Sequence, residues 1–338
     1  MSPLGDLGVR VIKIILNFHP IKSTMKRRSF LAVTALGAAS SALMPGNLFA
    51  RSGSSKEIRL GGPVYGKYND PGEWIQLLRK AGYKAALCPV NPGADAALIK
   101  AYSEDAAKND IVIAEVGAWS NPLSTDAETA RQAFKKCVDA LALADEIQAR
   151  CCVNISGSRN PKEWDAPHID NLTPATFDLI VETTRKIIDA VKPVHTFYTL
   201  EMMPWMYPDS ADSCLSLIKA INRKQFAVHL DPVNMVTSPS IYYRNGEMIR
   251  DAFRKLRPYI RSVHAKDILI KETAPQVQFD EVLPGQGILD YPALLSEIAK
   301  NPEIPLIIEH LDAEEKYRQA AAFIRETGKK AGISVSGS

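Results

Sequence analysis

The sequence predicts a (β/α)8 barrel, in which eight parallel strands close into a ring and helices cover its outside. From residue 57 onward, short runs of β-branched and apolar residues alternate with longer stretches of helical apolar spacing. Eight such short runs can be counted along the chain. The span from Glu57 to about Ile333 also has the size usual for this fold.

The expected strands share a short apolar core that ends at polar residues or at glycine. In chain order they lie at residues 57–62, 84–90, 111–119, 150–156, 196–202, 226–232, 260–267 and 305–311. A doubly wound open sheet is the rival architecture, but it often has a glycine-rich phosphate turn after its first strand, and none occurs here. No low-complexity linker divides the body, so we expect one barrel domain over residues 51–338.

Two of the expected helices have clear start and stop signals. Residues 70–82, "DPGEWIQLLRKAG", begin with Asp70 as a cap followed by proline, and they end at Gly82. Residues 173–193 begin with Thr173 and a following proline, and Pro193 closes the segment. These signals place helices directly between the expected strands, as a barrel requires.

The first fifty residues are expected to direct export. Residues 25–50 begin with Lys26, Arg27 and Arg28, continue with an uncharged, mildly apolar stretch and end at a small residue. Arg27 and Arg28, in "RRSFL", resemble the twin-arginine export motif, which predicts an exported, periplasmic protein. A membrane anchor is the alternative, but Pro45 and the following glycine interrupt the run, so no stable anchor is expected after processing. Residues 1–24 fit neither a signal nor a domain, and we expect a non-native or disordered extension there.

Replacement of both Arg27 and Arg28 by lysine should therefore retain the protein inside the cell. Cell fractionation would measure this, and N-terminal sequencing of the exported wild type should show a mature chain that begins close after Ala50. Exported protein that still carries residues before Met25 would contradict the prediction.

The charge and cysteine content point to a protein that binds small molecules. Lysine plus arginine number 41 against 38 aspartate plus glutamate, and no basic stripe interleaved with aromatic residues appears, so a nucleic-acid partner is not expected. The five cysteines have no regular spacing, which argues against a disulfide framework and against a zinc site of paired cysteines. The sequence leaves a homo-oligomer open.

Polar side chains stand at the ends of four consecutive expected strands. Glu201 ends the fifth, Asp231 the sixth, His264 the seventh and Glu309 the eighth. The carboxyl ends of barrel strands form one face, where active sites of this fold lie. Two glutamates, one aspartate and one histidine suit Mn²⁺, Mg²⁺, Co²⁺ or Zn²⁺, so we expect one divalent metal there.

Further residues near these strand ends are candidates for contacts with a substrate. Lys266 can hold an anionic or hydroxyl group, or it can pair with the neighbouring aspartate. Glu115 and Trp119, at the end of the third strand, and Trp205, after Glu201, can form a wall against the ring of a substrate, although aromatic residues near a barrel mouth as often serve packing.

Strands that end in Glu, Asp, "HAKD" and Glu, followed by a "PGQG" turn at 284–287, resemble the xylose-isomerase-like barrels called sugar phosphate isomerases/epimerases. The resemblance covers nearly all of residues 57–333. It implies that Glu201, Asp231, His264 and Glu309 bind one divalent metal and that Glu201 and Glu309 act as acid and base on a small sugar. Epimerases of this family commonly have a second histidine three residues after the aspartate, and Asn234 stands there instead.

The resemblance implies an isomerase or epimerase that removes a proton next to a carbonyl, and export favours an unphosphorylated sugar as its substrate. A lyase or dehydratase acting on a 3-keto-glycoside is the main alternative, because it begins with the same proton abstraction. A non-catalytic sugar-binding protein and a metal-dependent endonuclease are further alternatives. Asn234 can hydrogen-bond a substrate hydroxyl but cannot accept a proton at neutral pH.

Overall fold

The barrel predicted from the sequence is the fold of the protein. The computed structural model describes residues 57–338 except residue 274, so the expectations for residues 1–24 and 25–50 lie outside the described residues. Eight parallel strands close into a ring in the order β1-β10-β7-β6-β5-β4-β3-β2. These strands are β1 (Leu60–Gly62), β2 (Ala85–Leu87), β3 (Val112–Gly117), β4 (Cys151–Asn154), β5 (Tyr198–Glu201), β6 (Phe226–Leu230), β7 (Ile260–Ala265) and β10 (Leu306–Ile308).

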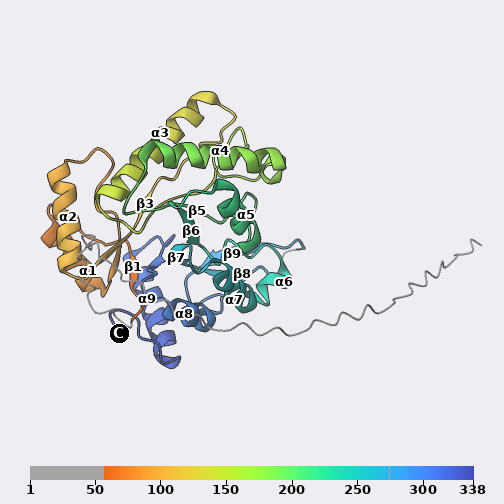
Figure 1. Ribbon diagram of the computed structural model, residues 1–338. Helices are drawn as coiled ribbons and strands as arrows, with labels where there is room; N and C mark the ends of the chain where they lie inside the picture. The colour runs from red at the N-terminus through yellow and green to blue at the C-terminus, as the bar shows by residue number, and fades with distance from the viewer. Residues whose placement is uncertain (1–56, 274) are drawn as a thin grey trace, which may run out of the picture. The chain divides into compact units, whose positions relative to one another are not determined.

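Helices follow the strands along the chain and surround the ring (Figure 1). They are α1 (Pro71–Ala81), α2 (Ala96–Lys108), α3 (Ala127–Glu146), α4 (Pro174–Val191), α5 (Ala211–Ile221), α6 (Pro239–Tyr242), α7 (Asn245–Leu256), α8 (Tyr291–Ala299) and α9 (Glu314–Lys330), with one 3₁₀ turn, η1 (Ile169–Leu172). Across the described residues, no helix combines the length and the apolar character needed to cross a membrane.

The helix ends follow the predicted capping signals. Asp70 accepts a hydrogen bond from the main-chain N–H of Glu73, and Gly82 ends α1 in the left-handed conformation with φ 69°. Thr173 caps α4 in the same way, and α4 ends at Val191, just before Pro193. Local sequence therefore determines where these two helices begin and end.

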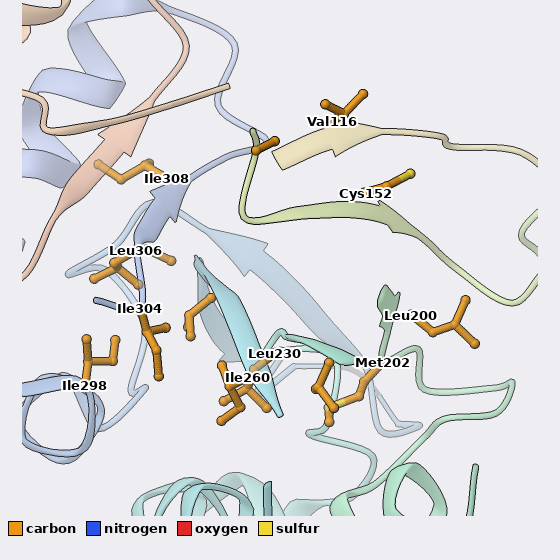
Figure 2. Packing of buried hydrophobic residues seen from close by; sticks show 14 of the residues in the cluster. Val116, Cys152, Leu200, Met202, Leu230, Ile260, Ile298, Ile304, Leu306 and Ile308 are labelled. Carbon is orange, nitrogen blue, oxygen red and sulfur yellow. The ribbon is translucent and has the colours of Figure 1, made fainter. Parts of the chain in front are cut away.

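Strand alternation sorts side chains between the helix layer and the inside of the barrel. Figure 2 shows Leu200, Leu230, Leu306 and Ile308 among the apolar residues that pack together, and all four are buried in the main core. Because successive side chains on a strand point to opposite faces, residues next to these point into the barrel. This alternation directs Glu201 inward from β5, and it directs Asp231 and Glu309, which directly follow β6 and β10, toward the same interior.

A two-stranded antiparallel hairpin interrupts the expected strand–helix repeat after the seventh barrel strand. It consists of β8 (Asp267–Ile270) and β9 (Phe279–Val282), and the apolar run at 268–270 belongs to it. The eighth barrel strand is therefore β10. The sequence pattern did not indicate this hairpin as an element distinct from the seventh barrel strand.

Asp267 joins this hairpin to the "PGQG" turn at 284–287. Its side chain is 1% exposed, and its two carboxylate oxygens accept hydrogen bonds from the main-chain N–H groups of Ile268, Gly285, Gly287 and Leu289, at 2.9–3.0 Å. A Cβ atom at Gly287 would lie 2.3 Å from Asp267 Oδ1, so only glycine allows this approach. The two motifs are thus parts of one structural unit.

Replacement of Asp267 by alanine should lower the free energy of unfolding by about 2–4 kcal/mol, because it leaves buried N–H groups without acceptors. Urea unfolding would measure the change. Asp280→Ala is the matched control, since Asp280 lies in the same hairpin, is half-exposed and pairs only with Lys271. An equal loss in both variants would contradict the assigned role of Asp267.

Candidate metal centre

The four predicted ligands converge at the carboxyl end of the barrel. Glu201 is the last residue of β5, Asp231 follows β6, His264 lies in β7 and Glu309 follows β10. One ligand atom from each lies within 4.8 Å of every other. These strands are consecutive in the ring, so Glu201 and Glu309 stand at the two ends of the arc.

His264 faces the three carboxylates with one nitrogen of its ring. Nδ1 lies 2.6 Å from Glu309 Oε1, 3.2 Å from Glu201 Oε1 and 3.7 Å from Asp231 Oδ2. Burial alone would lower the pKa of His264, but the surrounding Glu309, Glu201 and Glu115 outweigh this effect and raise it well above its usual value.

Lys266 supplies a second buried cation. Its Nζ lies 2.8 Å from Asp231 Oδ2, 2.7 Å from Glu309 Oε1 and 3.8 Å from Glu201 Oε1. Burial would lower the pKa of Lys266, yet these carboxylates raise it instead, so the ammonium stays charged. Its position shows that this arrangement of carboxylates attracts a cation.

The pKa values of the acidic groups move in different directions. Burial raises the pKa of Glu201, and the neighbouring Asp231 adds to this effect. For Asp231 and Glu309, burial also acts to raise the pKa, but the attraction of His264 and Lys266 prevails and lowers it. A divalent cation would favour the ionised form of all three groups.

The residues present fit a divalent metal. Asp231 Oδ2 and Glu309 Oε1 are buried, form no hydrogen bond of regular geometry, and lie 2.8 and 2.7 Å from Lys266 Nζ, so the charge of a cation compensates them. A divalent cation could compensate the same oxygens. Three carboxylates and an imidazole form a hard ligand set, which suits Mn²⁺, Mg²⁺, Co²⁺ or Zn²⁺.

A second polar cluster lies next to these ligands inside the barrel. Glu115 is buried in β3, and its carboxylate contacts His229 Nε2 at 2.9 Å, the hydroxyl of Ser262 at 3.1 Å and His264 Nε2 at 3.3 Å. Burial would raise the pKa of Glu115, but His264 and His229 outweigh it and lower the pKa. Glu115 therefore holds a proton on Nε2 of His264, which leaves Nδ1 as the nitrogen available to a metal.

A cavity of about 500 Å³ opens beside the ligands. Of the predicted substrate contacts, Asn234, Lys266, Trp119 and Trp205 line it, whereas Glu115 is not among its lining residues. Asn234 Nδ2 donates a hydrogen bond to Glu201 Oε1 at 3.0 Å, and the ring of Trp119 lies 6.5 Å from that of His264. The structure thus brings four of the five predicted contact residues to one cavity.

Several residues that line the cavity were not singled out by the sequence analysis. They are Ile155, Trp164, Asp165, Met203, Glu281 and His310. His310 follows Glu309, and strand alternation would direct it away from the site. However, the chain has left β10 at that point, and His310 adopts φ 58°, so alternation no longer applies. Only its position next to a predicted ligand could have indicated it.

We expect the purified protein to bind one divalent cation per chain, and an Asp231→Ala, His264→Ala double variant to lose stoichiometric binding because two of the four ligands are removed. Elemental analysis and titration calorimetry would measure this. Glu281→Gln is the control, since Glu281 lines the cavity without belonging to the ligand cluster. Full occupancy in the double variant would place the metal elsewhere.

Comparisons with solved structures agree with the fold. A xylose isomerase-like TIM barrel protein from Mycobacterium smegmatis in complex with magnesium is 15% identical, with a TM-score of 0.56 over 81% of this chain and 97% of that one. D-psicose 3-epimerase with D-tagatose from Clostridium cellulolyticum H10 is 14% identical, with a TM-score of 0.60 over 82% and 99%.

A third similar structure is the probable 3-DHS dehydratase involved in petrobactin synthesis from Bacillus anthracis, at 14% identity and a TM-score of 0.59 over 80% of this chain and 98% of that one. No curated protein matches the sequence. The family model described as xylose isomerase-like TIM barrel matches residues 75–327, which is more than half of the chain. The chain therefore belongs to the xylose isomerase-like TIM barrel family.

Proposed function

We propose that the protein is a divalent-metal-dependent sugar isomerase or epimerase that removes a proton next to a carbonyl of an unphosphorylated sugar. The observation that carries the proposal is the cluster of Glu201, Asp231, His264 and Glu309 beside an open cavity. Sugar epimerases among the similar structures support the same class of reaction, and so does a structure that contains magnesium.

The bound cation would polarise the sugar carbonyl and so make the neighbouring C–H group more acidic. Glu201 and Glu309 are the residues assigned to proton transfer. Both line the cavity, and they reach it from the two ends of the arc of strands that carries the ligands. Two carboxylates placed in this way can serve opposite faces of one carbon, as epimerisation requires.

The remaining polar residues of the cavity hold the substrate and fix the glutamates. Asn234 donates to Glu201 and so orients its carboxylate, while its own amide cannot take up a proton at neutral pH. Lys266 is placed to neutralise negative charge on a sugar oxygen. Trp119 lies close to His264 and offers a flat apolar surface to a sugar ring.

The charges that line the cavity favour an unphosphorylated substrate. Among its described lining residues, Lys266 and His310 are the basic ones, and each is already paired with carboxylates. Glu201, Glu281 and Glu309 add negative charge. A phosphate group would meet repulsion from these carboxylates, whereas an uncharged sugar would not.

A lyase or dehydratase that acts on a 3-keto-glycoside is the second candidate. Asn234 favours it, because this position carries no group that could serve as an additional acid or base. The first step, proton removal beside a carbonyl, would be the same. The two candidates differ in whether the sugar is reprotonated or loses a leaving group.

The reaction can be tested by offering free ketoses and 3-keto-glycosides to the metal-loaded protein in deuterated water. Solvent exchange with formation of a stereoisomer would identify the epimerase, and release of an aglycone the lyase. Glu201→Gln and Glu309→Gln should each lower the rate by about 10²–10⁴-fold, the range for loss of a general acid or base.

Metal content must be measured beside the rate, because both glutamates are also predicted ligands. Asp165→Asn is the matched control, since Asp165 lines the same cavity and its hydrogen bond with Trp205 uses only the main-chain oxygen of Asp165. Undiminished turnover in either glutamine variant would remove that glutamate from the mechanism. Neither exchange nor release with any of these sugars would contradict the proposed enzyme.

A further inference from the structure

We propose that the cavity has a second subsite, formed by Trp164 and Trp205, that binds a ring joined to the reacting sugar by a glycosidic bond. The inference rests on the proposed function, because it takes the metal centre as the place where the first sugar ring binds. It goes further in naming a glycoside, not a free monosaccharide, as the class of substrate.

Tryptophan is concentrated in this cavity. The chain has four tryptophans, and three of them, Trp119, Trp164 and Trp205, line it, while Trp74 is buried in the core. Trp119 is the one beside the metal ligands, since its ring lies 6.5 Å from that of His264. Trp164 and Trp205 come from two other loops, after β4 and after β5.

A direct hydrogen bond joins these two loops. Trp205 Nε1 donates to the main-chain oxygen of Asp165 at 2.6 Å, which places Trp205 against the residue that follows Trp164. Because the indole N–H is already used, Trp205 can offer a ligand its ring surface but no hydrogen bond. A ligand for this subsite must therefore present a flat or apolar face.

Trp164 is exposed at the cavity although it is a large apolar residue. Its side chain is 40% exposed, which costs free energy unless something covers it. The loop that carries it, residues 155–168, contains no helix or strand. A loop of this kind holds an exposed tryptophan in a fixed place only if other contacts determine its shape.

Buried side chains determine the shape of this loop. Asn121 donates from Nδ2 to the Ser158 main-chain oxygen at 2.7 Å and accepts from the Ser158 N–H at 3.1 Å. Asn171 accepts from the Arg159 N–H at 2.8 Å, and the Ser158 hydroxyl donates to the Ala166 oxygen at 2.6 Å. Asn121, Ser158 and Asn171 are all buried.

Gly157 completes this arrangement. It adopts φ 102°, and a Cβ atom there would lie 2.3 Å from Asn121 Oδ1. The polar groups of the loop are thus satisfied internally, while Trp164 stays open to the cavity. Because these hydrogen bonds already order the loop, ligand binding does not include the entropic cost of ordering it.

The lining of the cavity combines polar groups of the candidate metal centre with several apolar side chains. Glu201, Lys266 and Glu309 supply polar groups, and Ile155 and Met203 join the tryptophans in lining the cavity. Its volume of about 500 Å³ falls in the range of pockets that enclose ligands larger than one small ring. A sugar at the metal with a second ring against Trp164 and Trp205 contacts both kinds of side chain.

The second ring can be a planar aromatic aglycone or another sugar, since both stack on indole. The test uses probes whose blocked anomeric carbon cannot open to a carbonyl, namely 4-nitrophenyl β-D-glucoside, methyl β-cellobioside and methyl β-D-glucoside, titrated calorimetrically into the Mn²⁺-loaded full chain. At least one two-ring probe should bind about tenfold more tightly than methyl β-D-glucoside, as stacking of this strength implies. A preference for the nitrophenyl probe would indicate an aromatic aglycone, and a preference for methyl β-cellobioside a saccharide.

Trp164→Ala should reduce this preference to about twofold or less and leave the binding of methyl β-D-glucoside unchanged. Trp205→Phe should retain most of the preference because it keeps a ring surface, and Trp205→Ala should lose it. Tyr243→Ala is the control, since Tyr243 is an aromatic residue that is 69% exposed and does not line the cavity.

Equal binding of all three probes, no measurable binding of any, or an unchanged preference in Trp164→Ala would overturn the proposed subsite. Failure here is distinct from failure of the proposed reaction, because these probes do not react. If deuterium exchanges into free ketoses but no two-ring probe binds more tightly, the proposed reaction is supported and the proposed subsite is wrong. If a two-ring probe binds more tightly but no deuterium exchanges, the proposed subsite is supported and the proposed reaction is wrong.

Discussion

Inside this barrel, the negative charge of buried carboxylates is balanced by the positive charge of buried cations, and the stability of the interior depends on this balance. Glu115, Glu201, Asp231 and Glu309 all contact either His264 or Lys266, and all but Glu309 are almost fully buried. Carboxylates without partners in such surroundings would destabilise the fold by several kcal/mol each. The imidazole and the ammonium therefore keep the interior stable. Two of the carboxylate oxygens that they approach form no regular hydrogen bond, which suits these oxygens to a metal.

The strands of the barrel produce this balance through their alternation and their order. Leu200 and Leu230 pack into the core, so Glu201 and Asp231, the next residues, face inward. This regularity is why the fold and the convergence of the four candidate ligands could be predicted from the sequence: alternation and strand order require no knowledge of distant contacts. The same rule was misleading for His310, because that residue lies beyond the last strand and adopts a left-handed conformation.

Features that depend on contacts between distant segments could not be predicted in this way. Glu115 was expected near the substrate, since it lies on a strand that leads to the site, but its depth in the barrel depends on which residues β6 and β7 place opposite it. Trp164 lies in a loop whose shape depends on Asn171, just after the loop, and on Asn121, which lies 37 residues before its partner Ser158. The local pattern of apolar residues in the sequence does not indicate such hydrogen bonds.

The two parts of the cavity consequently differ in how they are built. The metal ligands lie on, or directly after, strands whose positions the closed ring fixes, and this suits chemistry that needs atoms placed within a few tenths of an ångström. Trp164 and Trp205 stand on loops that are held by side-chain hydrogen bonds and by the contact between Trp205 and Asp165. Under the proposed function, a change in these loops would alter which ring fits the cavity without moving any candidate ligand. The proposed reaction and the proposed choice of substrate thus depend on different elements of the structure, strand ends for the first and loops for the second.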